Sequence, residues 1–322
     1  MKAIVCNDFG PIQNIEYKDV NEPIIQDQSV IINVKSVGVN FPDGLLVQGK
    51  YQLKPDTPFI PGMEVAGEIV KIGPNVSSFK IGDRVAALSQ LSGYAEQAVV
   101  QEKSVFKIPS KMSFDDSCAL LCAYGTSHYA LKQRAYLKKN ELLVVLGASG
   151  STGIAAIQIG KIMGAKVIAV SSNSEKQKIA KDNGADISIG YDNLKEELKS
   201  ISNGKGIDVI FDPVGGDIFD TVARTMARSG RLLVIGFASG TIPKLAVNLA
   251  LVKEFSVVGV FWGAFTRSEP IEYKQNMIEL FNWYKEGLLK PLIQDSYPLS
   301  EAALVLEKIL ARGAKGKIIL KP

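Results

Sequence analysis

A glycine-rich segment near the middle of the chain has the residue types and spacing of a phosphate-binding turn. The apolar run Leu142–Leu146 leads into Gly147-Ala148-Ser149-Gly150-Ser151-Thr152-Gly153, and an apolar stretch with helical spacing follows. Glycine permits a tight turn close to a pyrophosphate, and the start of a helix adds unpaired N–H donors. The spacing is G-x-x-G-x-x-G rather than G-x-G-x-x-G, but the strand before it and the helix after it are the required context. The segment predicts a dinucleotide-binding loop; a glycine-rich turn without a ligand is the alternative.

The end of the next predicted strand indicates which dinucleotide would bind. Val167–Val170 is followed by Ser171-Ser172-Asn173-Ser174, without the Asp or Glu that usually bonds the ribose 2′-OH of NAD. Ser172 and Glu175 have the spacing of a capping box, which would direct that carboxylate to backbone N–H groups. Lys176 would lie in the first helical turn, where a cation opposes the helix dipole unless an anion binds there. Ser171, Ser172 and Lys176 therefore favour NADPH over NADH, with an ordinary exposed lysine as the alternative.

The cysteines and the only histidine carry no recognisable catalytic or metal-binding pattern. Cys6, Cys118 and Cys122 are odd in number and have no C-x-x-C spacing, which argues against a disulfide scaffold and a zinc ribbon and fits a reducing compartment. The i, i+4 pair Cys118 and Cys122 lies on an apolar segment and is expected in the core. His128 has no orienting carboxylate nearby in the sequence, so we expect a structural role for it rather than that of a general base.

Two different patterns of elements surround these residues. Residues 1 to about 120 form short apolar runs separated by Gly, Pro, Asn and Asp, which predicts a β-rich region. From Glu141 onward, apolar strands alternate with helix-length segments, which predicts a parallel sheet covered on both faces. A doubly wound dinucleotide-binding domain needs six such strands. They are Leu142–Leu146, Val167–Val170, Ile187–Ile189, Ile207–Phe211, Leu232–Ile235 and Phe255–Val260.

Length and charge set limits on the class of protein. A chain of 322 residues is long enough for two domains. The net charge of +4 comes without a run of one sign, so we expect no nucleic-acid or membrane surface. There is no h-region with a cleavage site and no stretch of about 18 apolar residues, so we expect neither a signal peptide nor a membrane span, and a cytoplasmic location.

Several short segments, in this order and spacing, resemble one known family from end to end. They are Gly38-Val39-Asn40-Phe41-Pro42-Asp43, Pro58-Phe59-Ile60-Pro61-Gly62-Met63-Glu64-Val65-Ala66-Gly67, Gly93-Tyr94-Ala95-Glu96, the glycine loop, Gly184-Ala185-Asp186, Asp212-Pro213-Val214-Gly215-Gly216 and Gly316-Lys317-Ile318-Ile319-Leu320. The chain resembles the medium-chain dehydrogenase/reductase superfamily, in its quinone oxidoreductase (zeta-crystallin-like) branch.

The resemblance implies a fold and a domain division. We expect an α/β protein with a doubly wound (Rossmann) nucleotide-binding domain over residues 123–263. A GroES-like irregular β-barrel catalytic domain would be formed by residues 1–122 with 264–322. NADPH would lie in the cleft between them, and members of the family commonly form homodimers through the edge of the nucleotide-binding sheet.

The metal of the zinc-dependent relatives has no ligands here. Those enzymes carry a catalytic Cys in the first quoted segment and a His in the second, where this chain has Asn40 and Met63; only Glu64 is kept. An amide and a thioether do not hold Zn²⁺, and three scattered cysteines cannot form the four-cysteine structural lobe. Without a Lewis acid, we expect reduction of a polarised C=C bond or a quinone rather than oxidation of an alcohol.

The resemblance also assigns roles to individual residues. Tyr51 is the expected hydrogen-bond donor near the nicotinamide, unless it is only a half-buried surface tyrosine. Asn40 and Asp43 would shape the pocket floor, although Asp43 could also be an Asx-turn residue. Thr126, at a predicted helix start, would lie beside the nicotinamide or only cap that helix, and Phe261 and Trp262 could instead serve in interdomain packing. The expected cofactor contacts are Thr126, Ser149, Gly150, Ser151, Thr152, Gly153, Ser171, Ser172, Lys176, Tyr191, Gly236, Phe237, Ala238, Val260, Phe261, Trp262 and Lys317.

The predicted function is hydride transfer from NADPH to a quinone or another electron-poor small molecule without zinc. Reduction of an enone or enoyl thioester uses the same hydride geometry and remains an alternative. A non-catalytic NADPH-binding or RNA-binding crystallin-like protein is the alternative from another class. The chain shows no basic stripe and no RNP-like motif in its favour.

Overall fold

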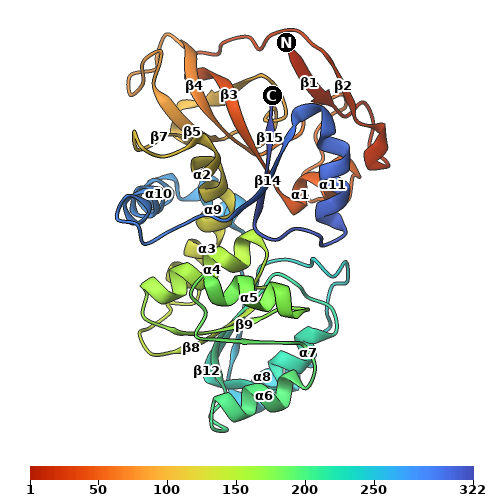
Figure 1. Cartoon of the computed structure of the whole chain (residues 1–322), viewed down its shortest axis with the longest axis vertical. Helices are drawn as coiled ribbons and strands as arrows, with labels where there is room; N and C mark the ends of the chain where they lie inside the picture. The colour runs from red at the N-terminus through yellow and green to blue at the C-terminus, as the bar shows by residue number, and fades with distance from the viewer. The chain divides into compact units, whose positions relative to one another are not determined.

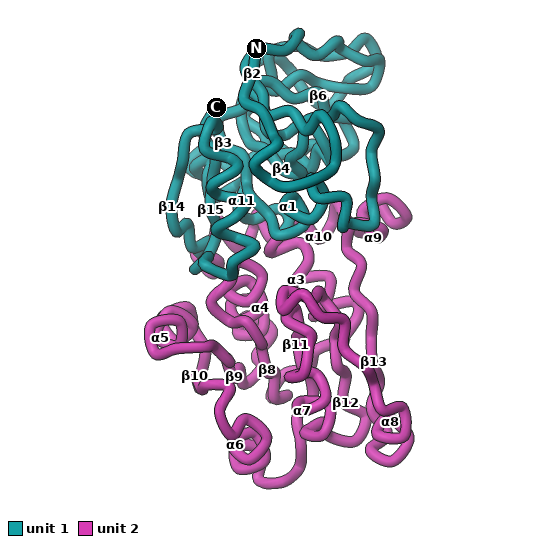
Figure 2. Tube along the Cα trace, turned by 90° about the vertical axis from the view of Figure 1, so that its right-hand side faces the viewer, with its two compact units in different colours: residues 1–122, 290–322 teal, residues 123–289 magenta.

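Two units make up the chain, and the first is assembled from both ends of the sequence. The computed structural model describes residues 1–322. Unit 1 contains Met1–Cys122 and Lys290–Pro322, and unit 2 contains Ala123–Leu289 (Figure 2). No helix is both long enough and apolar enough to cross a lipid bilayer.

Unit 1 is built on a seven-stranded sheet in which the C-terminal strand pairs with an early one. The strand order is β14-β15-β3-β4-β5-β7, and β6 also pairs with β3. All pairs are antiparallel except β14 with β15. The strands are β3 (Ser29–Val39), β4 (Glu64–Ile72), β5 (Arg84–Leu88), β6 (Gln97–Gln101), β7 (Val105–Lys107), β14 (Ile293–Pro298) and β15 (Lys317–Lys321).

Strand β3 runs through the centre of this sheet. Its residues are almost all buried, because β3 pairs with β4, β6 and β15. The apolar core of the unit includes Val30, Ile32 and Val37 of β3 and Ile318 of β15. The remaining elements are the hairpin of β1 (Lys2–Val5) and β2 (Glu16–Asp19), the helices α1 (Phe41–Val47), α2 (Phe114–Ala119) and α11 (Ala302–Leu310), and 3-10 turns at Ile12–Asn14, Glu102–Ser104 and Leu299–Glu301 (Figure 1).

Unit 2 contains the predicted doubly wound sheet. Its six strands are all parallel and lie in the order β10-β9-β8-β11-β12-β13. Chain order therefore reverses between β8 and β11, the switch point where such sheets bind ligands. The strands are β8 (Leu142–Leu146), β9 (Lys166–Val170), β10 (Ile187–Ile189), β11 (Ile207–Asp212), β12 (Met226–Val234) and β13 (Ser256–Gly259). The α/β class and the sheet type predicted from the sequence are confirmed.

Helices cover both faces of this sheet, as its continuous apolar strands require. Gly160 of α4 (Ser151–Ile162) lies close to Leu143 and Val167 on one face. Val144 and Ile168 face the opposite way, into the core formed with α6 (Leu194–Ile201) and α7 (Ile218–Ala223). Figure 1 shows α5 (Ser174–Asp182) beside α4, and α8 (Val247–Lys253) on the side of α6 and α7.

Two further helices belong to unit 2 rather than to the C-terminal return. They are α9 (Trp262–Ser268) and α10 (Pro270–Lys285), and α10 packs against α3 (Gly125–Tyr129). The expected domain boundary was at 263/264, whereas the compact unit continues to Leu289. The reason is polar as well as apolar packing: Gln133 Nε2 donates to Asn276 Oδ1 at 2.9 Å, and Trp262 meets Tyr273 edge to face.

His128 takes part in the same packing. It is fully buried, and its Nε2 lies 2.8 Å from Oε2 of Glu279 on α10. Burial lowers the pKa of His128, while hydrogen bonds from His128 and Lys132 hold the pKa of Glu279 at about 2. The carboxylate that the sequence lacked nearby comes from 151 residues away. This contact joins α3 to α10, which fits the structural role expected for His128.

Candidate active site

The predicted phosphate loop has the geometry that an anion needs. Gly147 follows β8 with a φ of +58°, and Gly150 is the N-cap of α4 with no capping side chain. The first N–H groups of α4, at Ser151, Thr152 and Gly153, therefore have no capping acceptor and lie at the positive end of a helix of 12 residues. Ser149 is buried in the turn.

The third glycine fixes the helix against the loop. A Cβ at Gly153 would lie 2.5 Å from the Gly147 carbonyl oxygen and 2.8 Å from Ala148 Cα, so no larger residue fits without moving the loop. From the other side, Ser127 Oγ donates to the Thr152 carbonyl at 2.9 Å and ties α3 to the start of α4. The preceding Thr126 is half-buried in a continuous helical run that includes π-helical turns at Leu120–Tyr124 and Ala130–Arg134. The interpretation of Thr126 as an N-cap is therefore wrong.

Two of the expected cofactor contacts, Ser171 and Tyr191, follow the strands β9 and β10. The Gly147 N–H donates to the hydroxyl of Tyr191 at 3.1 Å, so Tyr191 contacts the loop directly. Ser171, at the end of β9, is 2% exposed, and its hydroxyl has no protein hydrogen-bond partner. Buried hydroxyls almost always have a partner, so the Ser171 hydroxyl marks a place for a polar ligand group or water.

The start of α5 differs from the predicted capping box. Asn173, not Ser172, is the N-cap, and its Oδ1 accepts the Lys176 N–H at 2.9 Å. The reason is that the Ser171 N–H still donates to the Ile189 carbonyl in the sheet, so the N-cap lies one residue later than the capping box predicts. Ser172 is exposed, and Lys176 is half-buried in the first turn.

A buried carboxylate that the sequence analysis did not single out organises the loops after β11 and β12. Asp212 is 2% exposed, and its Oδ1 accepts the N–H groups of Val214 and Gly215 at 2.8 and 2.9 Å. Burial raises the pKa of Asp212, and the two N–H groups oppose that rise. The Gly236 N–H donates to the Asp212 carbonyl, and the Ala238 N–H to that of Pro213. In the sequence, the segment Asp212-Pro213-Val214-Gly215-Gly216 was what could have indicated that this carboxylate matters.

The two aromatic residues that follow β13 differ in exposure: one ring is buried and the other is exposed. Trp262 is 7% exposed and packs on Gly125, where a Cβ would lie 2.5 Å from its ring. Phe261 is 52% exposed, Val260 is buried, and Phe237 is half-buried beside Gly215. Packing within unit 2 accounts for Trp262, whereas cofactor contacts of Phe237, Val260 and Phe261 stay predictions.

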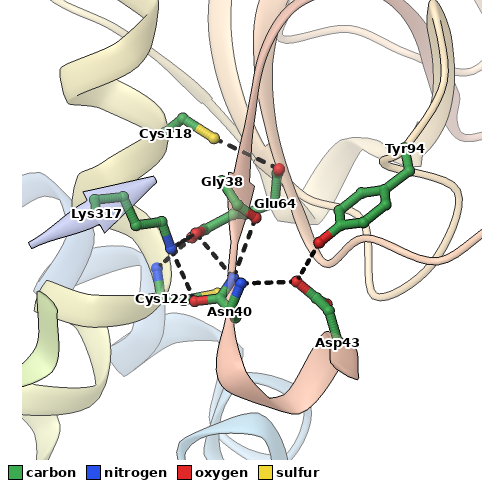
Figure 3. A network of polar contacts seen from close by, with 8 residues as sticks. All are labelled: Gly38, Asn40, Asp43, Glu64, Tyr94, Cys118, Cys122 and Lys317. Atoms are coloured by element: carbon green, nitrogen blue, oxygen red, sulfur yellow. Dashed lines mark hydrogen bonds and ion pairs between the residues drawn. The ribbon is translucent and has the colours of Figure 1, made fainter. Parts of the chain in front are cut away.

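In unit 1, three adjacent strands bring a buried charge pair together. The register places Gly38 opposite Glu64 of β4 and opposite Ile319 of β15, so the neighbouring Lys317 reaches the same place. Lys317 is 2% exposed and Glu64 is fully buried, and the Lys317 ammonium pairs with Glu64 Oε1 (Figure 3). The other oxygen, Oε2, accepts the Cys122 N–H at 2.8 Å. A Cβ at Gly38 would overlap the Glu64 carboxylate, so glycine is required there.

Asn40 connects this pair to the residues of the predicted pocket floor. Its Nδ2 donates to Glu64 Oε1 at 2.9 Å, and its Oδ1 accepts from Lys317 at 2.8 Å. The Asn40 N–H donates at 2.8 Å to Asp43 Oδ2, which also accepts from the Tyr94 hydroxyl at 3.0 Å (Figure 3). Asp43 Oδ1 is buried without a partner. The structure thus brings Asn40 and Asp43 together, and it adds Lys317, Glu64 and Tyr94.

The roles of Tyr51 and Lys317 also remain predictions. Tyr51 is half-buried, and its ring packs against the core of unit 1. Lys317 was grouped with the cofactor residues, but its ammonium is held by Glu64 and Asn40, and a cofactor contact would require it to leave both.

The polar network in unit 1 does not fit a zinc ion. No three His, Cys, Asp or Glu side chains come together anywhere in the chain as a metal site. Asn40 and Met63 are poor zinc donors, and the ammonium of Lys317 already neutralises Glu64. Burial raises the pKa values of the Cys118 and Cys122 thiols well above the ordinary range, which disfavours the thiolates that zinc needs.

Comparisons with known proteins agree with this geometry. Residues 26–110 match the family model of the alcohol dehydrogenase GroES-like domain, which confirms the expected domain type, and residues 151–283 match that of the zinc-binding dehydrogenases. The chain is 37% identical to the quinone oxidoreductase-like protein 2 homolog of Nematostella vectensis, over 99% of this chain and 88% of that protein.

Two solved structures are similar over the whole chain. The quinone oxidoreductase of Pseudomonas syringae is 30% identical with a TM-score of 0.94, over 100% of this chain and 99% of that one. The quinone oxidoreductase of Escherichia coli, crystallised with NADPH, is 26% identical with a TM-score of 0.93, over 100% of both chains.

The Asp43 carboxyl makes the stability of the fold depend on pH. Burial raises its pKa from 3.8 to about 7, against the opposing effects of the Asn40 N–H, Lys317 and Tyr94. Between these values the folded chain holds a proton that the unfolded chain releases, so this contribution is complete below pH 3.8 and is lost as the pH rises through about 7. Asp43→Asn lacks the ionisation. Its unfolding free energy relative to wild type should therefore rise by up to about 4 kcal/mol from low to high pH.

Urea unfolding from about pH 5 to about pH 8 covers about two pH units of this range and should show about 3 kcal/mol of the rise. Asp56→Asn, an exposed aspartate of the same unit, is the control and should show no such trend. A constant difference between Asp43→Asn and wild type would show that Asp43 is not protonated in the folded chain.

Proposed function

The chain belongs to the medium-chain dehydrogenase/reductase superfamily, in its quinone oxidoreductase branch, and on this basis we propose that it is an NADPH-dependent reductase. It would transfer hydride to a quinone or another electron-poor acceptor without zinc. The observation that carries the proposal is the glycine loop at the switch point of the sheet in unit 2, with no carboxylate at the end of β9. The similar Escherichia coli protein was crystallised with NADPH.

The residues around the loop fit the parts of this cofactor. The open N–H groups of Ser151, Thr152 and Gly153 would hold the pyrophosphate. The buried Ser171 hydroxyl, with Ser172 and Lys176 beyond it, would bind the adenosine ribose and its 2′-phosphate. The nicotinamide supplies the hydride when the cofactor is bound, so the protein has to orient it, exclude water and polarise the acceptor.

Residues of unit 1 would serve the acceptor. We assign the hydrogen bond to its oxygen to the Tyr51 hydroxyl, and we assign to Asn40 Oδ1 the hydroxyl that forms on the acceptor as it is reduced. Both hydrogens of the Asn40 NH₂ group are already donated, to Glu64 Oε1 and to the Gly38 carbonyl. Zinc independence is supported by the donor set, in which an amide, a thioether and an ammonium stand where a metal would need anionic or imidazole ligands.

Cofactor preference can be measured by titrating the protein with NADPH and NADH. We expect NADPH to bind at least about 10-fold more tightly, which is ~1.4 kcal/mol. Lys176→Ala should remove the preference, because it removes the cation nearest the start of α5. Lys178→Ala, on the same helix but paired with Asp182, should leave it unchanged. Equal binding of the two cofactors by wild type would contradict the assignment of Ser171, Ser172 and Lys176.

The acceptor class can be tested by following NADPH oxidation with menadione as a quinone and methyl vinyl ketone as an enone. We expect turnover of menadione, and the same rate after dialysis against EDTA. Turnover of the enone alone would identify a C=C reductase instead. Activity that appears only when Zn²⁺ is restored would refute zinc independence.

We further propose that two copies pair through the edge of the sheet in unit 2. Strand β13 is the last strand of that sheet, and its Val257 is 38% exposed. The nearby connection and helix α8 expose Ile242, Val247, Leu251 and Val252, each by more than 70%. An unprotected edge beside exposed apolar side chains favours pairing with an identical edge.

Light scattering after gel filtration tests this pairing. Wild type should have twice the 34.8 kDa mass of one chain. Val257→Lys places a charge on the edge and should give monomers, whereas Ile81→Lys, at an exposed isoleucine of unit 1, should not. A monomeric wild type would refute the proposal.

A further inference from the structure

The Asn40 side chain lies at the boundary of the buried charge pair. Glu64 and Lys317 are enclosed, whereas Asn40 is half-buried and so lies between the pair and the surface of unit 1. Its amide is engaged on both sides. Nδ2 donates to Glu64 Oε1 and, at 3.4 Å, to the Gly38 carbonyl, while Oδ1 accepts from Lys317 (Figure 3).

The charges decide which way this amide points. With Oδ1 towards the ammonium and Nδ2 towards the carboxylate, both contacts are charge-assisted hydrogen bonds. A flipped amide would place its NH₂ group against the ammonium and its oxygen against the carboxylate, and both contacts would repel. An asparagine without charged neighbours has no such preference, because its two ends are nearly equal in size. One orientation is therefore fixed by the ion pair.

We propose that Lys317 is a positioning residue, which with Glu64 fixes the Asn40 amide in the orientation that the acceptor requires. This inference rests on the proposed function, in which Asn40 contacts the acceptor. Lys317 acts only through Asn40. The Asn40 Oδ1 atom keeps one lone pair, which can accept from the hydroxyl that forms on the acceptor as it is reduced.

The surroundings of Lys317 and Glu64 keep both side chains charged and hold them in one geometry. Burial lowers the pKa of Lys317, but the nearby Glu64 carboxylate more than offsets this and the pKa is raised overall, so the amine stays protonated. The Cys122 N–H fixes the second carboxylate oxygen, and the lack of a side chain at Gly38 leaves the space that the pair fills. Both charged groups are buried, so turning away from each other would leave a buried charge without its partner.

The test compares the variants Lys317→Met, Glu64→Gln and their combination. Lys317→Met alone leaves a buried, unpaired carboxylate and should lower the melting temperature strongly. The double variant removes both charges at similar side-chain volume and should recover most of that loss. In the double variant, the neutral amide introduced at position 64 can either donate to Asn40 or accept from it, and the methionine can do neither. Only the long contact of Nδ2 with the Gly38 carbonyl then favours the original orientation, so the two orientations of the Asn40 amide become much closer in energy.

The kinetic result should separate positioning from stability. In the double variant we expect kcat with menadione to stay at least about 10-fold below wild type, although the melting temperature recovers. The affinity for NADPH should not change, because Lys317 is held by Glu64 and Asn40. A loss of NADPH affinity equal to the loss of kcat would assign Lys317 to cofactor binding and would overturn the proposal. In an Asn40→Ala background, the double variant should cause no further loss of kcat, because the residue through which the pair acts is absent. Recovery of kcat together with the melting temperature would overturn the proposal.

A second pair, which joins the same strand to α2 and is more exposed, serves as the control. Lys321 of β15 bonds Asp115 and Ser36, not Asn40. Lys321→Met combined with Asp115→Asn should leave kcat at the wild-type value. A loss of kcat equal to that of the Lys317 and Glu64 double variant would show that any lost charge pair in this sheet has the same effect, and would overturn the assignment to Lys317.

An observation that does not need turnover separates this inference from the proposed function. Protein labelled with ¹⁵N-asparagine should give a side-chain amide signal that is absent in Asn40→Ala and is thereby assigned. That signal should be shifted or broadened in the double variant and unchanged in the control. An unchanged signal in the double variant would overturn the positioning role even in an active enzyme. If wild type reduces no acceptor, the proposed function fails, and the NMR result alone decides whether the pair orients Asn40.

Discussion

The buried ion pair between Glu64 and Lys317 is the constraint on which unit 1 depends. It joins β4 to β15 across β3, and it requires a glycine at position 38 and a hydrogen-bonding side chain at position 40. Removing one partner of a buried pair typically costs about 3–5 kcal/mol, a large part of the stability of a domain. The C-terminal strand is therefore fixed to the sheet by charge as well as by backbone hydrogen bonds.

The candidate cofactor loop of unit 2 and the polar network of unit 1 differ in the groups that form them. In unit 2 the predicted cofactor loop offers mainly backbone groups, since N–H groups and glycines would do the binding, and Asp212 only holds neighbouring loops. Such a loop tolerates many side chains as long as the glycines remain. In unit 1 the network consists of side chains, and each depends on the hydrogen bonds and charges of the others, as Asn40, Asp43 and Tyr94 show. The polar network of unit 1 is therefore more sensitive to single substitutions than the loop of unit 2.

Local patterns in the sequence were enough for the sheet of unit 2 and its loop. The strand β8, the glycine turn and the helix α4 are contiguous, and each apolar run identified a strand because parallel strands are buried on both faces. The partners of Glu64 and His128 could not be found in this way. Lys317 and Glu279 reach them through sheet register and helix packing, which no short segment contains. The N-cap Asn173 was missed by one residue, because where a strand stops is decided by its neighbour rather than by its own sequence.

The pairing of an early strand with the last one has a consequence for the chain as it leaves the ribosome. Lys317 follows Asn40 by 277 residues, and the whole of unit 2 is translated between them. At roughly 5–20 residues per second, that interval lasts on the order of tens of seconds. During it the Glu64 carboxylate has no counter-ion and is better left in water than enclosed. Vectorial synthesis thus lets the nucleotide-binding unit fold first, while the amino-terminal strands stay open until the lysine that closes them emerges.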